Sequence, residues 1–298
     1  MTNIALTIFT PAYNRAHTLG RLFESLENQT LKNFEWLIID DGSEDDTKNV
    51  VDELIKKTSF PIRYFKQDNR GKQMAWNSAV ELAMGSLFCC LDSDDALYDK
   101  NNIADIYGKY YSYLSDDMVF GLRMLAYSNV KEGFDGVKLS SEVVICSYFD
   151  ELSDHKNYGE RIDFFKTSIL KSFLFPIEPG IKFIPEIWFY VTTAKAGYKF
   201  AYIPDAARIF FDDATENRLS RSSIKRHARG HYISRSKMLN EVPHRCYLKN
   251  PKAWIITMVR FSQCSNYLKI DFKKRVVDTN VFYTIISYVF FPLLLLLR

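Results

Sequence analysis

The sequence lacks the cysteine patterns of disulfide-stabilised domains and of structural zinc sites. It holds 5 cysteines in 298 residues, and none of them forms a CxxC pair. Small secreted folds use an even set of cysteines as a disulfide framework, and structural zinc sites need closely spaced ligands. The N-terminus shows neither a basic leader nor a small-residue cleavage site before its first apolar run. We therefore expect a reducing, cytoplasmic location.

The glycine-rich loops that hold phosphates in many nucleotide-binding proteins are also missing. No GxxxxGK[ST] motif occurs, and no GxGxxG follows the first apolar run. The HExxH pattern of zinc hydrolases is absent as well. Any bound nucleotide must therefore have its phosphates held by other groups.

Charge is distributed unevenly along the chain. The net charge is +3, yet residues 218–275 contain 15 Lys and Arg against only Glu241 and Asp271, so that stretch carries +13 and the remainder −10. Residues 281–297 follow with 17 positions free of charge. A basic segment beside an apolar one is typical of a membrane-surface module.

Two parts are therefore expected, a catalytic domain over residues 1–217 and a basic, helical, membrane-associating region over residues 218–298. The apolar run has the minimum length for a span and contains Tyr283, Tyr288 and Pro292, which favours peripheral or monotopic attachment over a true span. Because the basic charge is not interleaved with a recognition motif, no nucleic-acid partner is expected.

Two hydrophobic periods alternate through the first third of the chain. Short apolar runs predict four strands, and segments with apolar residues at helical spacing separate them. This alternation predicts a parallel sheet covered by helices on both faces. A further strand around Leu122–Tyr127 breaks the pattern and indicates a mixed sheet. The four predicted strands are Ala5–Phe9, Trp36–Ile39, Ile62–Phe65 and Leu87–Leu91.

Special residues follow three of these strands. They are Thr10–Asn14 after the first, Asp40–Ser43 after the second and Asp92–Asp95 after the fourth. Ligands of open α/β sheets bind beyond the carboxyl ends of the strands, so these segments should converge. Clustered acids need a divalent cation, ligand hydroxyls, a base edge or solvent to compensate them. Mg²⁺ or Mn²⁺ with a diphosphate explains the cluster economically.

Three segments, in this order, closely resemble the N-terminal half of glycosyltransferase family 2: TIFTPAYNRAHTLGRLFESLENQT, FEWLIIDDGSEDDT and GKQMAWNSAVELAMGSLFCCLDSDDAL. The resemblance covers about residues 4 to 100. It implies the GT-A fold, a Rossmann-like mixed sheet flanked by helices. It also implies inverting transfer from a nucleotide-sugar donor with Mn²⁺ or Mg²⁺ as cofactor.

The same resemblance assigns the donor site. Asp40 would face the base edge, where a carboxylate accepts a bond from an imide N–H, so a UDP-sugar is favoured. Arg70, or Lys72 beside it, would lie near the diphosphate. Asp92 would lie near the ribose and Asp94 would bind the metal, with Asp95 assisting either role. The donor-binding residues implied are Thr10, Pro11, Ala12, Tyr13, Asp40, Arg70, Asp92 and Ser93.

An inverting transfer also needs a carboxylate to take the proton from the acceptor hydroxyl. The family places this base in its second half, and Glu186 occupies a suitable position after Pro185, at the start of a predicted helix. The Glu-Asp pair common in the family is missing here. Glu160, Asp163 and Asp154 are therefore alternatives.

The expected activity is transfer of a sugar to a glycan or lipid-linked acceptor in surface polysaccharide synthesis, at the inner face of the cell membrane. A sugar nucleotidyltransferase is an alternative, although the glycine-rich basic loop of that class is missing. A non-catalytic scaffold that binds sugar nucleotides is another, and the intact DSDD segment with Glu186 disfavours it.

Overall fold

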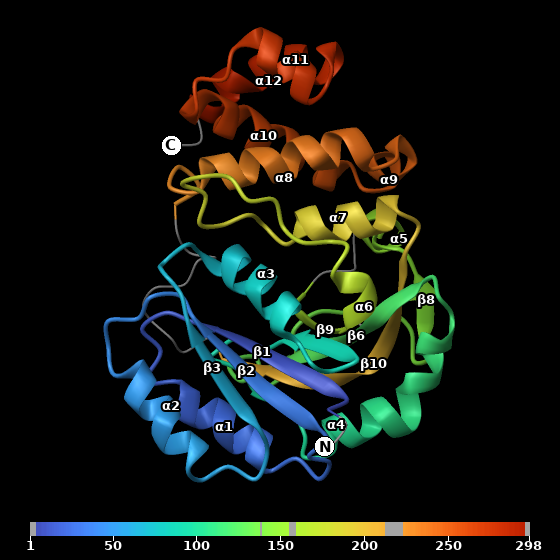
Figure 1. The fold of residues 1–298 in the computed structure, drawn as a ribbon. Coiled ribbons are helices and arrows are strands. Elements are labelled where there is room, and N and C mark those ends of the chain that lie inside the picture. Colours follow the sequence, from blue (N-terminus) through green and yellow to red (C-terminus); the bar gives the residue numbers. More distant parts are fainter. Residues whose placement is uncertain (1–3, 138, 155–158, 212–222, 296–298) are drawn as a thin grey trace. The chain divides into compact units, whose positions relative to one another are not determined.

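The computed structural model describes residues 4–137, 139–154, 159–211 and 223–295, which form two compact units (Figure 1). Unit 1 comprises Met1–Cys146, Asn157–Pro176 and Lys199–Ala214. Unit 2 comprises Ser147–Lys156, Ile177–Tyr198 and Thr215–Arg298. The domain boundary predicted after residue 217 lies outside the described residues and stays a prediction.

The predicted alternation of strands and helices in unit 1 is confirmed. Strands β1 to β4 run parallel in the order β3-β2-β1-β4. The elements are β1 (Leu6–Ala12), α1 (Leu19–Glu27), β2 (Phe34–Asp40), α2 (Thr47–Ile55), β3 (Ile62–Lys66), α3 (Lys72–Leu82) and β4 (Leu87–Cys90).

Helices cover both faces of this half of the sheet because successive side chains of a strand point to opposite faces. Ile8 of β1 belongs to the core cluster that includes Leu22 of α1 and Val51 of α2. The next residue, Phe9, packs instead against Trp76 of α3, with ring centroids 6.2 Å apart. Loops directly follow the carboxyl ends of β1, β2 and β4.

The second half of the sheet is mixed, as expected. Antiparallel β9 (Arg161–Lys166) lies between β4 and β6 (Val119–Ser128), and β10 (Lys199–Phe210) pairs parallel with β6. The short β5 (Ala96–Leu97) directly follows the DSDD segment and pairs with β10, so that Leu97 lies opposite Arg208. The remaining elements of unit 1 are α4 (Asn102–Asp105), η1 (Ile106–Tyr110), η2 (Tyr111–Ser115), β7 (Gly133–Phe134), β8 (Val144–Cys146) and α6 (Thr167–Leu170).

The described residues of unit 2 form helices and connecting loops, with no strand among them. Gly230 lets α8 approach the Phe183 backbone closely, since a Cβ there would lie 1.8 Å from the Phe183 carbonyl oxygen. In the described part of the chain, none of the helices has both the length and the apolar character needed to cross a membrane. The helices are α5 (Tyr148–Ser153), α7 (Ile187–Lys195), α8 (Ala228–Glu241), α9 (His244–Lys249), α10 (Pro251–Tyr267), α11 (Phe272–Asp278) and α12 (Val281–Leu295).

Candidate functional site

The three special strand ends converge, as predicted. The Thr10 hydroxyl donates to the Leu91 carbonyl at 2.8 Å and accepts from the Trp36 indole N–H at 2.9 Å. The Asp41 N–H donates to the Ala12 carbonyl at 2.8 Å. The Thr10 hydroxyl, near the end of β1, therefore bonds both to Leu91 directly after β4 and to Trp36 within β2, and the Asp41 bond joins the ends of β1 and β2. In the structure, Thr10 helps to hold these strands in position. Its predicted contact with a nucleotide stays a prediction.

The loop after β1 is fastened to the loop after β2. Asn14 has the left-handed φ of 55°, which asparagine tolerates better than most residues. Its N–H donates to Ser43 Oγ at 2.9 Å, and its Oδ1 accepts from the Glu44 N–H at 2.8 Å. Pro11 and Ala12, the last residues of β1, are half-buried and buried, whereas Tyr13, the first residue of the loop, is 45% exposed. Tyr13 is thus the predicted residue of this loop whose ring is open to a ligand.

Asp40 is fully buried and binds protein groups with both oxygens. Its Oδ1 accepts from the Ser43 N–H at 2.7 Å, and its Oδ2 accepts from the Tyr64 hydroxyl. Burial, and then the Asp40 carboxylate, raise the pKa of Tyr64, so its proton stays in place. A contact with a base edge, which stays a prediction, would use the second lone pair of one of these oxygens.

Asp41, which the sequence reasoning did not select, organises the segment before α3. Its Oδ1 accepts from the Arg70 N–H at 2.9 Å, and its Oδ2 accepts from the Gly71 N–H at 2.7 Å. Gly71 has a φ of 96°, which favours glycine and lets the chain turn into the helix. The Arg70 side chain is exposed on this segment. The available sequence signal for Asp41 was its position directly after another acid, Asp40, at the end of a predicted strand.

Lys72, at the start of α3, contacts the DSDD segment, residues Asp92–Asp95. Its Nζ is 2.9 Å from Asp92 Oδ1, and the two side chains are 19% and 38% exposed. Burial opposes the charge of Asp92, but Lys72, Arg208 and Arg15 outweigh it and hold the pKa of this carboxyl below its usual value. Asp92 is therefore ionised at neutral pH. Of the two basic residues considered for the diphosphate, the structure joins Lys72 to the DSDD segment.

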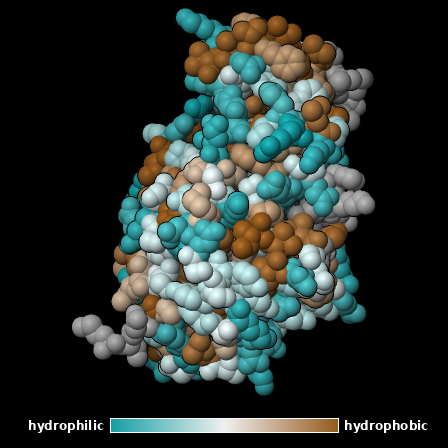
Figure 2. Space-filling view, turned by 90° about the vertical axis from the view of Figure 1, so that its right-hand side faces the viewer, coloured by the Kyte–Doolittle hydropathy of each residue, from teal (hydrophilic) through white to brown (hydrophobic). Residues whose placement is uncertain are grey.

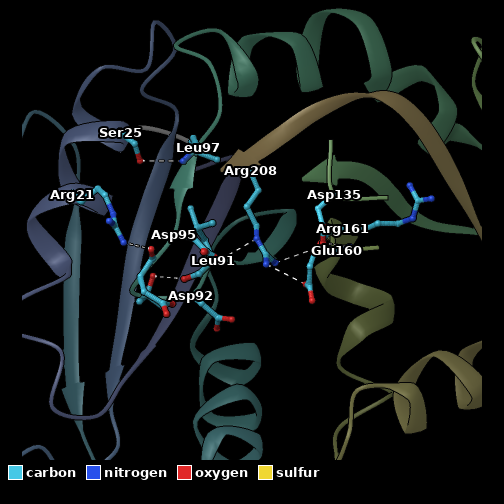
Figure 3. A network of polar contacts seen from close by, with 12 residues as sticks. Arg21, Ser25, Leu91, Asp92, Asp95, Leu97, Asp135, Glu160, Arg161 and Arg208 are labelled. Atoms are coloured by element: carbon cyan, nitrogen blue, oxygen red, sulfur yellow. Dashed lines mark hydrogen bonds and ion pairs between the residues drawn. The ribbon is translucent and has the colours of Figure 1, made fainter. Parts of the chain in front are cut away.

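The DSDD segment forms a turn held from its backbone (Figure 3). The Asp95 N–H donates to the Asp92 carbonyl at 3.0 Å, and Arg21 Nη2 donates to the Asp94 carbonyl. Ser93 is buried within the turn, and Asp94 is half-buried. Arg21 also lies over the Phe211 ring, 3.6 Å from its centroid. The turn is thus held through the backbone carbonyls of Asp92 and Asp94.

Arg208 of β10 reaches Asp95 from the other side, and sequence reasoning missed it (Figure 3). Its Nε lies 2.9 Å from Asp95 Oδ2, and its Nη2 donates to Glu160 Oε2 at 3.2 Å. Burial and the neighbouring acids Asp92 and Asp94 raise the pKa of Asp95 to about 7, against the opposing effect of Arg208. A lone arginine within the apolar stretch AARIFF was the available signal.

Replacing Arg208 with methionine is expected to destabilise the protein by about 3–5 kcal/mol, because Asp95 would be left buried without its cation. The double variant Arg208→Met with Asp95→Leu should recover much of this loss, since an apolar pair of similar volume often replaces a buried ion pair at little cost. Urea unfolding curves measure both. Lys48→Met, which removes the exposed pair of Lys48 with Asp52, is the control and should cost less than about 1 kcal/mol. Equal effects of Arg208→Met and Lys48→Met would contradict this account.

The acidic residues fit a metal that binds together with a phosphate ligand. In the part of the chain that the structure describes, no group of three or more His, Cys, Asp or Glu could by itself hold a metal ion. Asp92 and Asp95 already pair with Lys72 and Arg208. Mg²⁺ and similar ions are commonly held by one or two carboxylates with substrate phosphates completing the shell. Asp94, with Asp92, suits this arrangement.

Glu186, in unit 2, is the N-cap of α7, so the predicted helix start is confirmed. Its carbonyl accepts from the Phe189 N–H at 2.9 Å, and its side chain is exposed. Among the alternatives, Asp163 is buried and 3.2 Å from Arg123 Nη1, and Glu160 binds Arg208. Asp154 is exposed at the end of α5. The role of Glu186 as a base stays a prediction.

Comparison with known proteins supports this picture. The profile of Glycosyl transferase family 2 matches residues 7–169. The GalNAc(5)-diNAcBac-PP-undecaprenol beta-1,3-glucosyltransferase of Campylobacter jejuni is 29% identical over 172 residues, which are 56% of this chain and 53% of that protein. The chain spans only 13% to 21% of the length of five further relatives.

Two solved structures share the fold. Residues 1–349 of S. aureus TarS with UDP-GlcNAc match with a TM-score of 0.62 at 17% identity, over 88% of this chain and 72% of that one. The mannosyltransferase PcManGT from Pyrobaculum calidifontis with GDP-Man and Mn²⁺ matches with a TM-score of 0.59 at 17% identity, over 96% and 86%. The expected α/β architecture, a mixed sheet flanked by helices as in GT-A enzymes, is confirmed.

Proposed function

This chain belongs to glycosyl transferase family 2, and we propose that it transfers a sugar from a nucleotide-diphosphate donor to an acceptor hydroxyl with inversion at the anomeric carbon. The observation that carries the proposal is the convergence of the DSDD turn, Lys72 and the Tyr13 loop at the carboxyl ends of parallel strands. This arrangement provides an ammonium group for phosphate, an exposed ring for a base and carboxylates for a cation.

We propose that different parts of the donor bind different residues of this site. Tyr13 would contact the base, Asp92 would lie near the ribose, and Ser93 would bind the donor beside it. Lys72 forms an ion pair with Asp92. A bound diphosphate would share Lys72 and add its own negative charge, which calls for a further cation. We propose a UDP-sugar, and the UDP-GlcNAc bound by TarS supports this choice, whereas PcManGT with GDP-Man makes a guanosine donor the competitor to test.

Asp94 is the proposed ligand of Mn²⁺ or Mg²⁺, with the donor phosphates as its other partners. The ion would supply positive charge to the departing diphosphate. The Mn²⁺ in the PcManGT structure supports the use of a divalent metal on this fold. Arg21 holds the backbone of Asp94, so its carboxylate stays directed by a fixed turn.

Glu186 is the proposed general base. The N-terminus of a helix favours the ionised form of a carboxylate, which is the form that accepts the hydroxyl proton. As the acceptor oxygen attacks the anomeric carbon, its proton passes to Glu186 and the nucleoside diphosphate departs from the opposite side. Asp163 and Glu160 serve less well because Arg123 and Arg208 already bind them.

The proposed acceptor is a lipid-linked glycan, reached by a cytoplasmic enzyme attached to the inner face of the cell membrane. The Campylobacter jejuni relative is named for a glycan on undecaprenol diphosphate, which supports an acceptor of this class. The basic stretch of residues 218–275 suits an anionic surface.

A panel of UDP- and GDP-sugars tests the donor class. With Mn²⁺ present, hydrolysis or transfer from one UDP-sugar should exceed that from every GDP-sugar by at least about tenfold, a difference of about 1.4 kcal/mol in transition-state binding. EDTA should abolish it. Release of pyrophosphate from a nucleoside triphosphate and a sugar phosphate would instead identify a nucleotidyltransferase. Tight UDP-sugar binding without turnover, with a panel of acceptors present, would identify a scaffold.

A further inference from the structure

Helix α12 packs Ile286 and Phe290 inward beside hydroxyl-bearing side chains and exposes a second, largely apolar face. Three of its buried side chains carry hydroxyl groups, whereas five side chains that are largely apolar are exposed. At about 100° per residue the exposed positions fall within an arc of about 120°, opposite the buried ones. In water a surface helix buries its apolar face instead. The buried residues are Tyr283, Thr284 and Ser287, and the exposed ones, called the α12 stripe below, are Val281, Phe282, Ile285, Tyr288 and Val289.

Hydrogen bonds inside unit 2 fix which face of α12 points outward. Arg275 of α11 is 3% exposed, and its Nη1 donates to Ser287 Oγ at 3.0 Å. Its Nη2 donates to Asn266 Oδ1 at 2.9 Å, and its Nε to the Ile270 carbonyl at 2.9 Å. The Ser262 hydroxyl of α10 donates to the Ser287 carbonyl. A slip of α12 by one or two residues would break these bonds, so the apolar stripe faces outward by construction.

The stripe continues onto α11 and is flanked by basic residues. Phe272 is exposed and stacks on Tyr288, with ring centroids 6.2 Å apart. Lys269 lies three residues before Phe272 and Lys273 directly after it, and both lysines are exposed. Figure 2 shows hydrophobic residues gathered over α11 and α12.

We propose that the α12 stripe, with Phe272, Lys269 and Lys273, embeds in an anionic lipid bilayer and holds α12 parallel to the membrane surface. One face of the helix already packs on α10, so only the opposite face can meet the acyl chains. Aromatic side chains favour the headgroup level, and each lysine near an anionic surface contributes about 1 kcal/mol. The inference deepens the membrane location proposed above and does not depend on the transfer reaction.

A second copy of this chain is the competing occupant, and the charge disfavours it. Residues 218–275 carry 15 basic residues against two acids. Two such regions brought face to face would repel each other, whereas an anionic bilayer attracts the same charge. The apolar stripe and the charge therefore select the same partner.

Co-sedimentation of the full chain with vesicles tests the proposal. Vesicles of phosphatidylcholine with phosphatidylglycerol should bind the wild type, and Phe282→Glu with Ile285→Glu should weaken partitioning by about tenfold or more, because two large apolar side chains leave the bilayer. Lys269→Glu with Lys273→Glu should weaken binding to these anionic vesicles but not to uncharged ones. The loss of binding should be smaller at high salt, which screens the charges. Val130→Glu with Val137→Glu, at exposed apolar positions of unit 1, is the matched control and should bind like wild type.

Each outcome separates this proposal from the others. Both substituted stripe positions are exposed, so the melting temperature should stay unchanged, and donor hydrolysis in solution should stay unchanged as well. The proposal is overturned if wild type does not bind anionic vesicles, or if the stripe variant binds as well as the Val130 and Val137 control. It is also overturned if sedimentation velocity shows a wild-type dimer that the stripe variant dissociates. Absence of donor hydrolysis in the wild type as well as in every variant would count against the proposed function instead.

Discussion

Replacing Asp94 with alanine is expected to lower metal-dependent turnover of a UDP-sugar by about a thousandfold or more, equivalent to about 4 kcal/mol of transition-state stabilisation. The fold should persist, because the Asp94 carbonyl, to which Arg21 donates, remains in the alanine variant. The substitution therefore removes the proposed metal ligand and leaves the turn in place. The rate with saturating Mn²⁺ and the melting temperature give the two measurements.

A binding measurement distinguishes a lost metal ligand from a distorted site. Titration calorimetry of UDP should show that Mn²⁺ strengthens binding to wild type but hardly to Asp94→Ala. Asp117→Ala, which removes an exposed carboxylate of unit 1, is the control and should match wild type in both respects. Unchanged wild-type turnover in EDTA would refute the assignment of Asp94 to a metal.

Replacing Glu186 with glutamine is expected to leave UDP and Mn²⁺ binding within about twofold of wild type while transfer falls by about 10² to 10⁴-fold. Glutamine keeps the size of the side chain and the helix start but cannot accept the proton. The substitution should therefore lower kcat and leave the KM of the donor nearly unchanged. Initial rates at varied donor and acceptor concentrations separate the two constants.

Asp154→Asn serves both as control and as competitor, because Asp154 is an exposed carboxylate of the same unit. It should transfer sugar at nearly the wild-type rate. The reverse result, with Glu186→Gln active and Asp154→Asn inactive, would move the base to Asp154. The melting temperature of each variant checks that the loss is chemical.

The strand ends could be predicted from sequence because hydrophobic period and chain order settle them. Four apolar runs alternating with helical patterns allow few arrangements other than a parallel sheet, and its carboxyl ends then lie together. The predicted convergence of Thr10, Asp40 and Asp92 followed from this rule alone. The individual hydrogen bonds could not be predicted in this way. The side-chain oxygens of both Thr10 and Asp40 form hydrogen bonds with other groups of the protein.

The site contacts that could not be predicted from the sequence depend on pairings between distant segments. Arg208 meets Asp95 only because β5 pairs with β10 across more than a hundred residues, and no local pattern contains that pairing. The choice between Arg70 and Lys72 required the direction in which α3 begins, which Asp41 sets through Gly71. Neither the spacing nor the charge of these residues holds that information.

The division of the chain into two units also limits how the protein can be dissected. The backbone passes between the units five times, so neither unit is one continuous segment. The core of unit 2 joins Phe149 of α5 and Val191 of α7 to Met238 of α8 and Tyr247 of α9. A fragment ending at residue 217 would keep the first two of these side chains and lose their partners. The helical unit is thus interwoven with the sheet-bearing unit along the chain, and the enzyme must be studied whole.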